Sequence, residues 1–433
     1  MSRATTASPS APPTVTIKQH PAHAVPRRRF LPLGPRTSMA VFASILMSLL
    51  GSSSAPTPLY AIYQQHWGFS PITITVVFGV YAVAVLSALL FFGKLSDHVG
   101  RRPVVVTALV VQVVAMAVFM GASDVGALMT ARVLQGLSVG AAVGALGAGM
   151  LDIHPRRGGF LNSFAPMLGT ASGAIVSGLI VQYLPAPTRL VYAILLVVFA
   201  LQALAVLAMP ETVSRKPGAR ASMIPEFKLP RSARAGVAIA VMFAVWSMSG
   251  LYGALGPSIT RALTHSTSVV WGGLPLFVLA VSAALTTVTL RSAGARSVML
   301  LSIGTLILGA AVTVLAIGSG DGGTGSVIGF FVGTAIAGIG FGSGFQGGIR
   351  LVIPQVEAHE RAGVLSLLYV VCYVGLGLPA IIAGVLVVHG GGLIVTSREY
   401  SITLIVLALV ALAGLLRNGR RNKNRLEAQV SEA

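Results

Sequence analysis

Twelve long apolar stretches dominate this sequence and limit what the chain can fold into. Each is close to the roughly 20 residues that a helix needs to cross the hydrocarbon core of a bilayer. Hydrophobic residues make up 55% of the chain and charged residues 9%, with a mean hydropathy of +0.85, whereas a soluble protein carries about a quarter charged residues. The stretches cover approximately residues 38–59, 72–92, 103–122, 126–150, 160–182, 188–209, 235–257, 269–289, 297–317, 325–349, 362–388 and 400–416. The sequence therefore predicts an all-α membrane protein with twelve transmembrane helices.

The apolar stretches fall into two groups of six, separated by a polar segment at 210–234. We expect an N-terminal six-helix bundle over 38–209, a cytoplasmic central loop, and a C-terminal six-helix bundle over 235–416. The runs are continuous, which favours helices over the short alternating strands of a membrane barrel. Residues 1–37 are basic and hold seven prolines, a composition typical of a disordered tail. Residues 417–433 form a second polar tail.

The positive charges indicate how the chain crosses the membrane. When the N-terminus is placed in the cytoplasm, all but four of the 30 Lys and Arg residues lie in the tails or in loops on that side. The exceptions are Arg132, inside a stretch, and Arg189, Arg261 and Arg398 on the far side. This is the positive-inside asymmetry of membrane proteins. We therefore expect a multi-pass protein of the plasma (inner) membrane, embedded in its lipid bilayer, with both termini cytoplasmic. The net charge of +19 does not indicate a nucleic-acid partner, because it is spread over separate segments.

The two halves show traces of an internal repeat. Laying "RSAGARSVML" (291–300) on "DHVGRRPVVV" (97–106) aligns Gly294 with Gly100 and Arg296 with Arg102. Laying "ERAGVL" (360–365) on "RRGGFL" (156–161) gives a second match of similar length. Both matches are short, but they fall in equivalent loops of the two halves. They suggest parallel repeats, as in transporter folds built from two six-helix bundles.

Charges are concentrated in one short loop, "GKLSDHVGRRPV" at 93–104. The positive-inside rule explains its basic residues, but not Asp97 or the flanking glycines, which allow a tight turn and a close helix approach. The loop resembles the signature loop of the major facilitator superfamily, with matches at Gly93, Leu95, Asp97, Gly100, Arg101, Arg102 and Pro103. The twelve stretches, the central loop and the half repeats resemble the same family over essentially residues 38–416. The resemblance implies two pseudo-symmetric bundles.

The same resemblance implies that the loop acts as a conformational latch. In the family, the motif aspartate lies near the cytoplasmic start of the eleventh helix, which here begins near Ala362. A helix N-terminus attracts a carboxylate by about 0.3–2 kcal/mol, which biases a two-state equilibrium without locking it. We expect Arg101 and Arg102 to orient Asp97 and to meet Asp152. The latch would be closed when the cytoplasmic side is shut.

Arg132 places a permanent charge inside the fourth stretch. One interpretation is that its side chain extends to the outer surface, since arginine near the bilayer centre costs about 2.5–3.5 kcal/mol. The other is that it faces a central cavity. The R-x-x-Q-G spacing of Arg132, Gln135 and Gly136 resembles a fourth-helix motif of the same family, which favours the cavity. Arg132 and Gln135 are therefore candidates for binding substrate or for coupling.

Other candidates for the cavity are Trp246, Tyr252, Gln346 and Tyr373, polar or aromatic side chains in three different stretches. For each of them, helix packing or anchoring at the membrane interface is the alternative role. No carboxylate lies in the middle of a predicted stretch, whereas many proton-coupled carriers titrate one there. Coupling to protons is therefore left open.

These features predict a secondary active transporter of a small organic solute that works by alternating access, with export favoured, and that is a monomer. A facilitator or an uptake carrier for a sugar or an organic anion is the alternative. A membrane-embedded enzyme is disfavoured because the sequence has no H-E-x-x-H motif and no metal-ligand spacing. We expect no metal or cofactor: the single cysteine, Cys372, rules out a Cys-cluster site, and the G-x-G-x-x-G matches near 318–325 and at 342–347 follow no predicted strand.

Overall fold

The computed structural model describes residues 33–93, 95–211, 232–318, 323–356 and 361–431. Twelve helices in this part of the chain are long and apolar enough to cross a membrane. They are α1 (Pro35–Ser54), α3 (Pro71–Phe92), α5 (Arg101–Gly121), α6 (Val125–Ile153), α7 (Pro155–Tyr183), α8 (Pro187–Leu207), α9 (Ala233–Ala254), α11 (Val270–Thr289), α12 (Ala295–Gly318), α13 (Thr324–Val352), α14 (Arg361–His389) and α15 (Gly392–Ser431). The predicted all-α class and the twelve membrane helices are confirmed.

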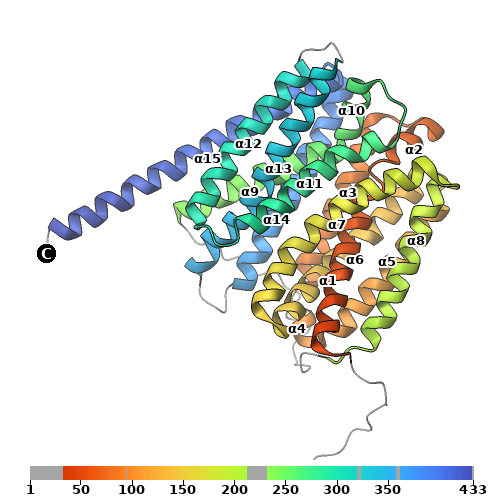
Figure 1. Ribbon diagram of the computed structural model, residues 1–433, viewed down its shortest axis with the longest axis horizontal. Coiled ribbons are helices and arrows are strands. Elements are labelled where there is room, and N and C mark those ends of the chain that lie inside the picture. The colour runs from red at the N-terminus through yellow and green to blue at the C-terminus, as the bar shows by residue number, and fades with distance from the viewer. Residues whose placement is uncertain (1–32, 94, 212–231, 319–322, 357–360, 432–433) are drawn as a thin grey trace, which may run out of the picture.

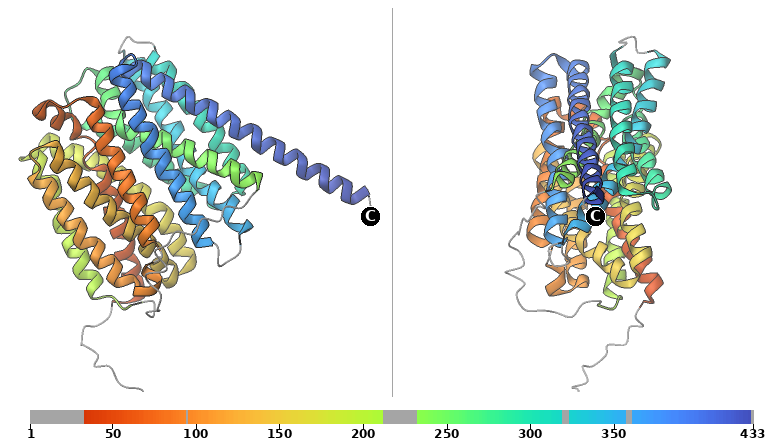
Figure 2. Two further views of the ribbon diagram at one scale, coloured as in Figure 1. Left: turned by 180° about the vertical axis from the view of Figure 1, so that it is seen from behind. Right: turned by 90° about the vertical axis from the view of Figure 1, so that its left-hand side faces the viewer.

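The twelve helices form two bundles of six that lie side by side (Figures 1 and 2). In the N-terminal bundle, α6 packs against α3 and α5, and α7 packs against α1. In the C-terminal bundle, α13 packs against α12 and α11, and α14 packs against α9. Each bundle buries its own apolar core, while many leucine and valine side chains remain on the outside of the protein, where lipid would cover them.

Two helix pairs make the main contacts between the bundles. They are α3 with α14 and α7 with α11. If the halves are repeats, α3 corresponds to α11 and α7 corresponds to α14. A pseudo-twofold rotation would then place the α3–α14 interface on the α11–α7 interface. The lengths of corresponding helices support this relation, since α6, α13, α7 and α14 each have 29 residues.

The first helix of each half ends earlier than predicted, and a short helix follows it. α1 was expected to reach residue 59 but ends at Ser54, because Pro56 and Pro58 have no N–H to continue it. The chain then turns into α2 (Tyr60–Trp67). In the second half, α9 ends at Ala254 and α10 (Gly256–Thr264) has Pro257 in its first turn.

The last helix is much longer than the predicted stretch 400–416. α15 begins at Gly392, directly after a tight turn in which Gly391 and Gly392 have φ of 106° and 88°. Arg398 and Glu399 lie within the helix, because charges at the end of a span can leave the apolar core without ending the helix. The helix continues to Ser431 and projects away from the bundles (Figure 1), so the described part of the predicted tail is helical. The predicted N-terminal tail (as far as residue 32) and most of the central loop (212–231) lie outside the described residues.

Candidate functional site

A cavity of about 940 Å³ lies between the bundles and is lined by residues of α1, α7, α11 and α13. Its mouth contains four arginines: Arg156 and Arg157 in the first turn of α7, Arg291 in the loop after α11, and Arg350 in the last turn of α13. We call this end of the molecule, which also holds the loop at Asp97, the basic end. The cavity therefore opens at the basic end.

A second cavity continues the first toward the middle of the molecule. The two share Ser163, Met167 and Phe345 on their walls, and the inner one also reaches α3, α9 and α14. Trp246 and Tyr373 line this inner cavity. Residues from both bundles thus surround one continuous space, as a substrate pathway requires.

The other end of the molecule, which we call the opposite end, is closed by tight packing between the bundles. A Cβ atom on Gly79 of α3 would overlap Ile381 of α14, and one on Gly384 of α14 would overlap Thr75. At the other interface, a Cβ atom on Gly178 of α7 would lie 3.3 Å from the Cα atom of Val270. Small residues at such positions let helices approach closely, so the cavity is sealed at this end.

Aromatic rings surround the inner cavity on the side of the C-terminal bundle. The ring of Trp246 lies 5.1 Å from that of Tyr373, 5.8 Å from Phe341 and 5.9 Å from Phe345, measured between centroids. Buried polar atoms in the cavity walls also lack hydrogen-bond partners among the described residues: Thr57 Oγ1, Trp246 Nε1 and Gln346 Oε1. Such groups are costly to leave unpaired, which points to water or a ligand as their partner.

Arg132 is fully buried within the N-terminal bundle. Its Nε atom donates a hydrogen bond to the Tyr60 hydroxyl at 2.9 Å, and its Nη1 atom donates to the Ser53 carbonyl at 3.0 Å and to Gln135 Oε1 at 2.6 Å. The guanidinium also lies 5.3 Å from the centroid of the Tyr81 ring. No acidic side chain pairs with it among the residues that the structure describes.

This placement matches neither of the two interpretations of Arg132 in full. The side chain does not extend to the surface, and it is not part of the described cavity walls. Instead it lies directly behind them, since Ser53 and Tyr81, both in contact with Arg132, line the inner cavity. Gln135 is buried beside it and donates to the Ser52 carbonyl at 2.9 Å.

The remaining candidates in the second half occupy different places. Gln346 lines the outer cavity, where its Nε2 atom lies 3.4 Å from the Thr287 carbonyl. Tyr252 is fully buried inside the C-terminal bundle, with its hydroxyl 2.8 Å from Thr313 Oγ1, and it is absent from the described cavity walls. The structure therefore brings Trp246, Gln346 and Tyr373 to the cavity and leaves Tyr252 in a packing position.

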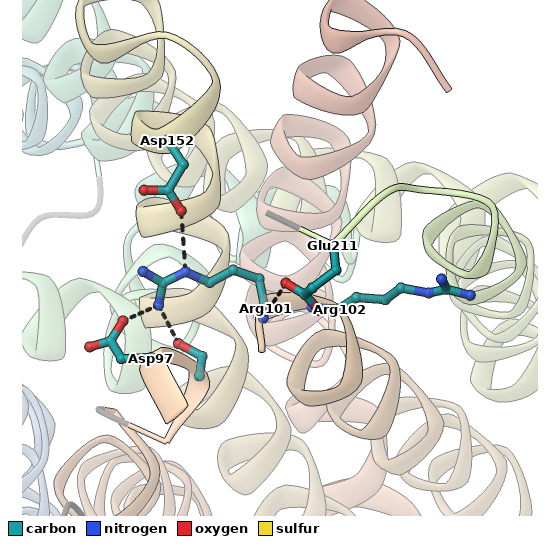
Figure 3. A network of polar contacts seen from close by, with 6 residues as sticks. Asp97, Arg101, Arg102, Asp152 and Glu211 are labelled. Carbon is teal, nitrogen blue, oxygen red and sulfur yellow. Dashed lines mark hydrogen bonds and ion pairs between the residues drawn. The ribbon is translucent and has the colours of Figure 1, made fainter. Parts of the chain in front are cut away.

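The charged loop at the basic end forms a cluster within the N-terminal bundle (Figure 3). Arg101, at the start of α5, pairs with Asp97 of the short helix α4 (Ser96–Val99), and its Nε atom lies 3.4 Å from Asp152 Oδ2 near the end of α6. Its Nη1 atom also donates to Ser96 Oγ at 2.6 Å. The side chain of Arg102 turns the other way and donates to the Leu207 carbonyl at the end of α8.

Glu211 belongs to this cluster, although the sequence analysis did not identify it as a site residue. Its carboxylate accepts hydrogen bonds from the backbone N–H groups of Arg101, at 2.9 Å, and Arg102, at 3.1 Å. These are the first N–H groups of α5, which have no partner within the helix, and a negative charge is favourable there. The signal was the "PET" segment at 210–212, which follows the sixth stretch.

Two glycines shape the turn around this cluster. Gly100 has a φ of 110°, and a Cβ atom there would lie 2.6 Å from Glu211 Oε2. Gly93, at the end of α3, lies against α6, since a Cβ atom on Gly144 would be 3.4 Å from its carbonyl oxygen. The predicted contact between Asp97 and the start of α14 stays a prediction, because the side chains of 361–363 lie outside the described residues.

Comparisons with known proteins agree with this architecture. The family model described as "Major Facilitator Superfamily" matches residues 41–335, which is more than half of the chain. The inner membrane transport protein YnfM of Escherichia coli is 29% identical over 191 residues, covering 42% of this chain and 45% of that protein. Citrate exporter 1 of Aspergillus niger is 30% identical over 181 residues, covering 41% of this chain and 33% of the exporter. The matched region thus spans less than half the length of these curated relatives.

Solved structures of transporters share the fold. The nucleoside transporter NupG superposes with a TM-score of 0.66 at 13% identity, covering 88% of this chain and 99% of that chain. A bacterial homologue of the lysosomal transporter Spinster, in an inward-facing and occupied conformation, gives 0.66 at 14% identity, covering 89% and 97%. With the family model, the twelve helices and the two bundles, these likenesses lead to one conclusion: the chain belongs to the Major Facilitator Superfamily of membrane transporters.

Proposed function

We propose that this protein is a secondary transporter that exports a small organic solute by alternating access. The observation that carries the proposal is the continuous space formed by the outer and inner cavities between the bundles, which opens at the basic end and is bounded by tight helix packing at the opposite end. A solute enters such a space from one side only. Release on the other side requires the bundles to rock, so that α3–α14 and α7–α11 separate at the opposite end.

The distribution of charge supports the direction in which the cavity faces. In the sequence, all but four of the 30 Lys and Arg residues fall in the tails or in the loops expected on the cytoplasmic side, because positively charged loops remain in the cytoplasm. The basic end is therefore cytoplasmic in this proposal, and the structure corresponds to an inward-open state. Export is supported by the names of two relatives, citrate exporter 1 of Aspergillus niger and multidrug resistance protein MdtL of Citrobacter koseri. Uptake by the same cavity is the alternative.

The cluster around Asp97 would regulate the return from this state. While the basic end is open, Asp97 is paired with Arg101 inside its own bundle. When the bundles close over that end, the start of α14 approaches α4, and its N-terminal N–H groups attract the Asp97 carboxylate. Gly93, Gly100, Arg101, Arg102 and Asp152 hold Asp97 in position in both states, and Glu211 anchors the start of α5.

The lining of the two cavities does not identify the energy source that drives transport. Among the described residues, the walls of both cavities contain no Asp, Glu or His side chain. A proton would then be carried by the substrate or by Asp152 near the basic end. Flux that is independent of a pH gradient would favour the facilitator alternative.

A reversible crosslink tests alternating access directly. Ala82 of α3 and Gly377 of α14 face each other across the interface, with a Cβ atom on Gly377 placed 3.0 Å from that of Ala82. We would introduce Ala82→Cys and Gly377→Cys in a Cys372→Ser background and measure flux of labelled organic acids, sugars and nucleosides in proteoliposomes. Oxidation should abolish flux of the transported solute, and a reductant should restore it.

The matched control is a pair within one bundle, Ala88→Cys with Gly140→Cys, whose Cβ atoms face each other between α3 and α6 at 2.7 Å. Crosslinking of this pair should leave flux intact, because the helices of one bundle move together. Unchanged flux after complete crosslinking of the interface pair, verified by mass spectrometry, would overturn the proposal.

A further inference from the structure

The mouth of the cavity between the bundles carries positive charge without a matching negative charge. Four arginines line it, Arg156, Arg157, Arg291 and Arg350, and no acidic residue is among its described lining residues. Arg350 has a structural task, because its guanidinium donates hydrogen bonds to the carbonyls of Leu290 at 3.2 Å, Ala293 at 2.9 Å and Arg291 at 2.8 Å. The other three side chains are exposed to the cavity, so they are available to an incoming solute.

This arrangement differs from that of the arginine cluster on the rim nearby. Arg101 is paired with Asp97 and Asp152 in the same bundle. No ion pair of Arg156, Arg157 or Arg291 with another described residue is found. The positive-inside rule accounts for basic residues in these loops. It does not require that their side chains line one cavity, or that the cavity lacks carboxylates. A cavity lined by one sign of charge concentrates solutes of the other sign.

A second positive charge lies deeper, behind the wall of the inner cavity. The guanidinium of Arg132 is a cationic group, and it is buried without an acidic partner among the described residues. It contacts the inner cavity through Ser53 and Tyr81. In surroundings of low dielectric constant, the field of such a charge extends farther than it does in water. The inner cavity is therefore favourable for an anion and unfavourable for a cation.

The walls of the inner cavity add a requirement on the shape of the solute. Trp246, Phe341, Phe345 and Tyr373 present aromatic rings to it, which suits a flat apolar group. Aromatic rings also bind cations, but the arginines around this cavity would repel one. The unpartnered Trp246 Nε1–H is a donor for an oxygen of the solute.

We infer that the cavity binds a small organic anion with a flat apolar body. The anionic group is drawn in by Arg156, Arg157 and Arg291 and is then stabilised in the inner cavity by the field of Arg132, while the apolar body packs against the rings around Trp246. This inference rests on the proposed transport function and names the substrate class for it.

Three probes with the same ring and different charges test the inference. Benzenesulfonate is a permanent anion, benzenesulfonamide is its neutral analogue, and benzyltrimethylammonium is a permanent cation. Binding to the purified full-length protein in lipid nanodiscs would be measured by calorimetry. We expect benzenesulfonate to bind at least tenfold more tightly than either of the others, and its affinity to fall as salt is added.

Variants then locate the charge that is responsible. Arg157→Gln and Arg291→Gln should each weaken benzenesulfonate binding about tenfold, as expected for loss of one charge-assisted contact. The control is Arg189→Gln, which removes the same charge from an exposed position at the start of α8, at the opposite end. It should leave the affinity unchanged. Equal unfolding temperatures of all the variants would confirm that folding is intact.

The inference is overturned if the neutral or cationic probe binds as tightly as the anion, if none of the three binds, or if Arg189→Gln weakens binding as much as the cavity variants do. Its failure is distinguishable from failure of the transport proposal. Flux of a neutral or cationic solute in proteoliposomes would contradict the anion inference but agree with the transport proposal. Binding of the anion with no flux of any anion would agree with the anion inference but contradict the transport proposal.

Discussion

The Nε atom of Arg132 in α6 donates a hydrogen bond to the hydroxyl oxygen of Tyr60 in α2, 2.9 Å away. Both residues are buried almost completely, so this bond ties a charge in a membrane helix to the short helix that follows the proline break. A buried cation needs such acceptors, because burying a charge without hydrogen bonds is expensive. In the absence of a carboxylate among the described residues, Tyr60, Ser53 and Gln135 provide them.

Tyr60→Phe should therefore destabilise the protein. The variant keeps the ring and removes the acceptor, and a hydrogen bond to a charged group contributes about 1.5–3 kcal/mol. Thermal unfolding of the purified protein would measure the loss. Tyr63→Phe is the control, since Tyr63 donates to another neutral hydroxyl, that of Tyr192, at 3.2 Å and should cost about 0.5–1.5 kcal/mol. An equal decrease in both variants would contradict the role assigned to the guanidinium.

Gly100→Ala should be more harmful than the same change at Gly294, its counterpart in the second half. Gly100 has positive φ and lies against Glu211, whereas nothing lies within 4 Å of a Cβ atom on Gly294. Strain of this kind costs about 1–3 kcal/mol. Thermal unfolding of the two variants side by side gives the comparison. If Gly294→Ala lost as much stability, the contact with Glu211 would not be what restricts position 100.

Gly79→Val should shift the protein away from the inward-open state. The added side chain would overlap Ile381 of α14, so α3 and α14 would be forced apart at the opposite end. We expect greater labelling of a single cysteine introduced at Thr75 by a membrane-impermeant maleimide, together with slower transport. Gly304→Val, at a position in α12 with open space around it, should change neither. Unaltered labelling in correctly folded Gly79→Val protein would count against the closed interface.

Asp97→Asn should favour the state that is open at the basic end. Loss of the charge removes the attraction to the start of α14, which is worth up to about 2 kcal/mol, or more than tenfold in population. A single cysteine at Gln346, which lines the cavity mouth, should be labelled faster from the cytoplasmic side. Asp124→Asn removes an equal charge at the opposite end, where Asp124 caps α6, and should have no effect. Unchanged labelling in Asp97→Asn would argue against the latch.

Much of the fold could be predicted from the sequence, because hydropathy reports directly on which segments leave water. The breaks after α1 and α9 were missed because the predicted spans ran through Pro56, Pro58 and Pro257, although proline favours the start of a new helix. The start of α15 was missed for a different reason. The predicted stretch 400–416 begins directly after the charged pair Arg398 and Glu399, whereas α15 begins at Gly392, because a helix can carry charge beyond the apolar layer.

The candidate site was harder to predict, because hydropathy says how deep a residue lies but not which way it faces. Trp246 and Tyr252 are both aromatic residues of α9, yet six residues correspond to about 240° around a helix. One therefore faces the cavity and the other the interior of the bundle. Arg132 and Gln135 are three residues apart and therefore lie on the same face of α6. Their spacing in the sequence correctly indicated that the two side chains are neighbours, and they form a hydrogen bond. Glu211 acts through backbone N–H groups, so the only sequence signal for it was its place in the "PET" segment after the sixth stretch.

The uninterrupted course of α15 has a practical consequence. Its 40 residues correspond to a rod of about 60 Å, at 1.5 Å per residue, which is roughly twice the thickness of the hydrocarbon core. A helical fusion partner joined in register at Ser431 would inherit the orientation of the last membrane helix. It would serve as a rigid marker for electron microscopy, and its angle to the membrane would report how far the C-terminal bundle tilts during each cycle.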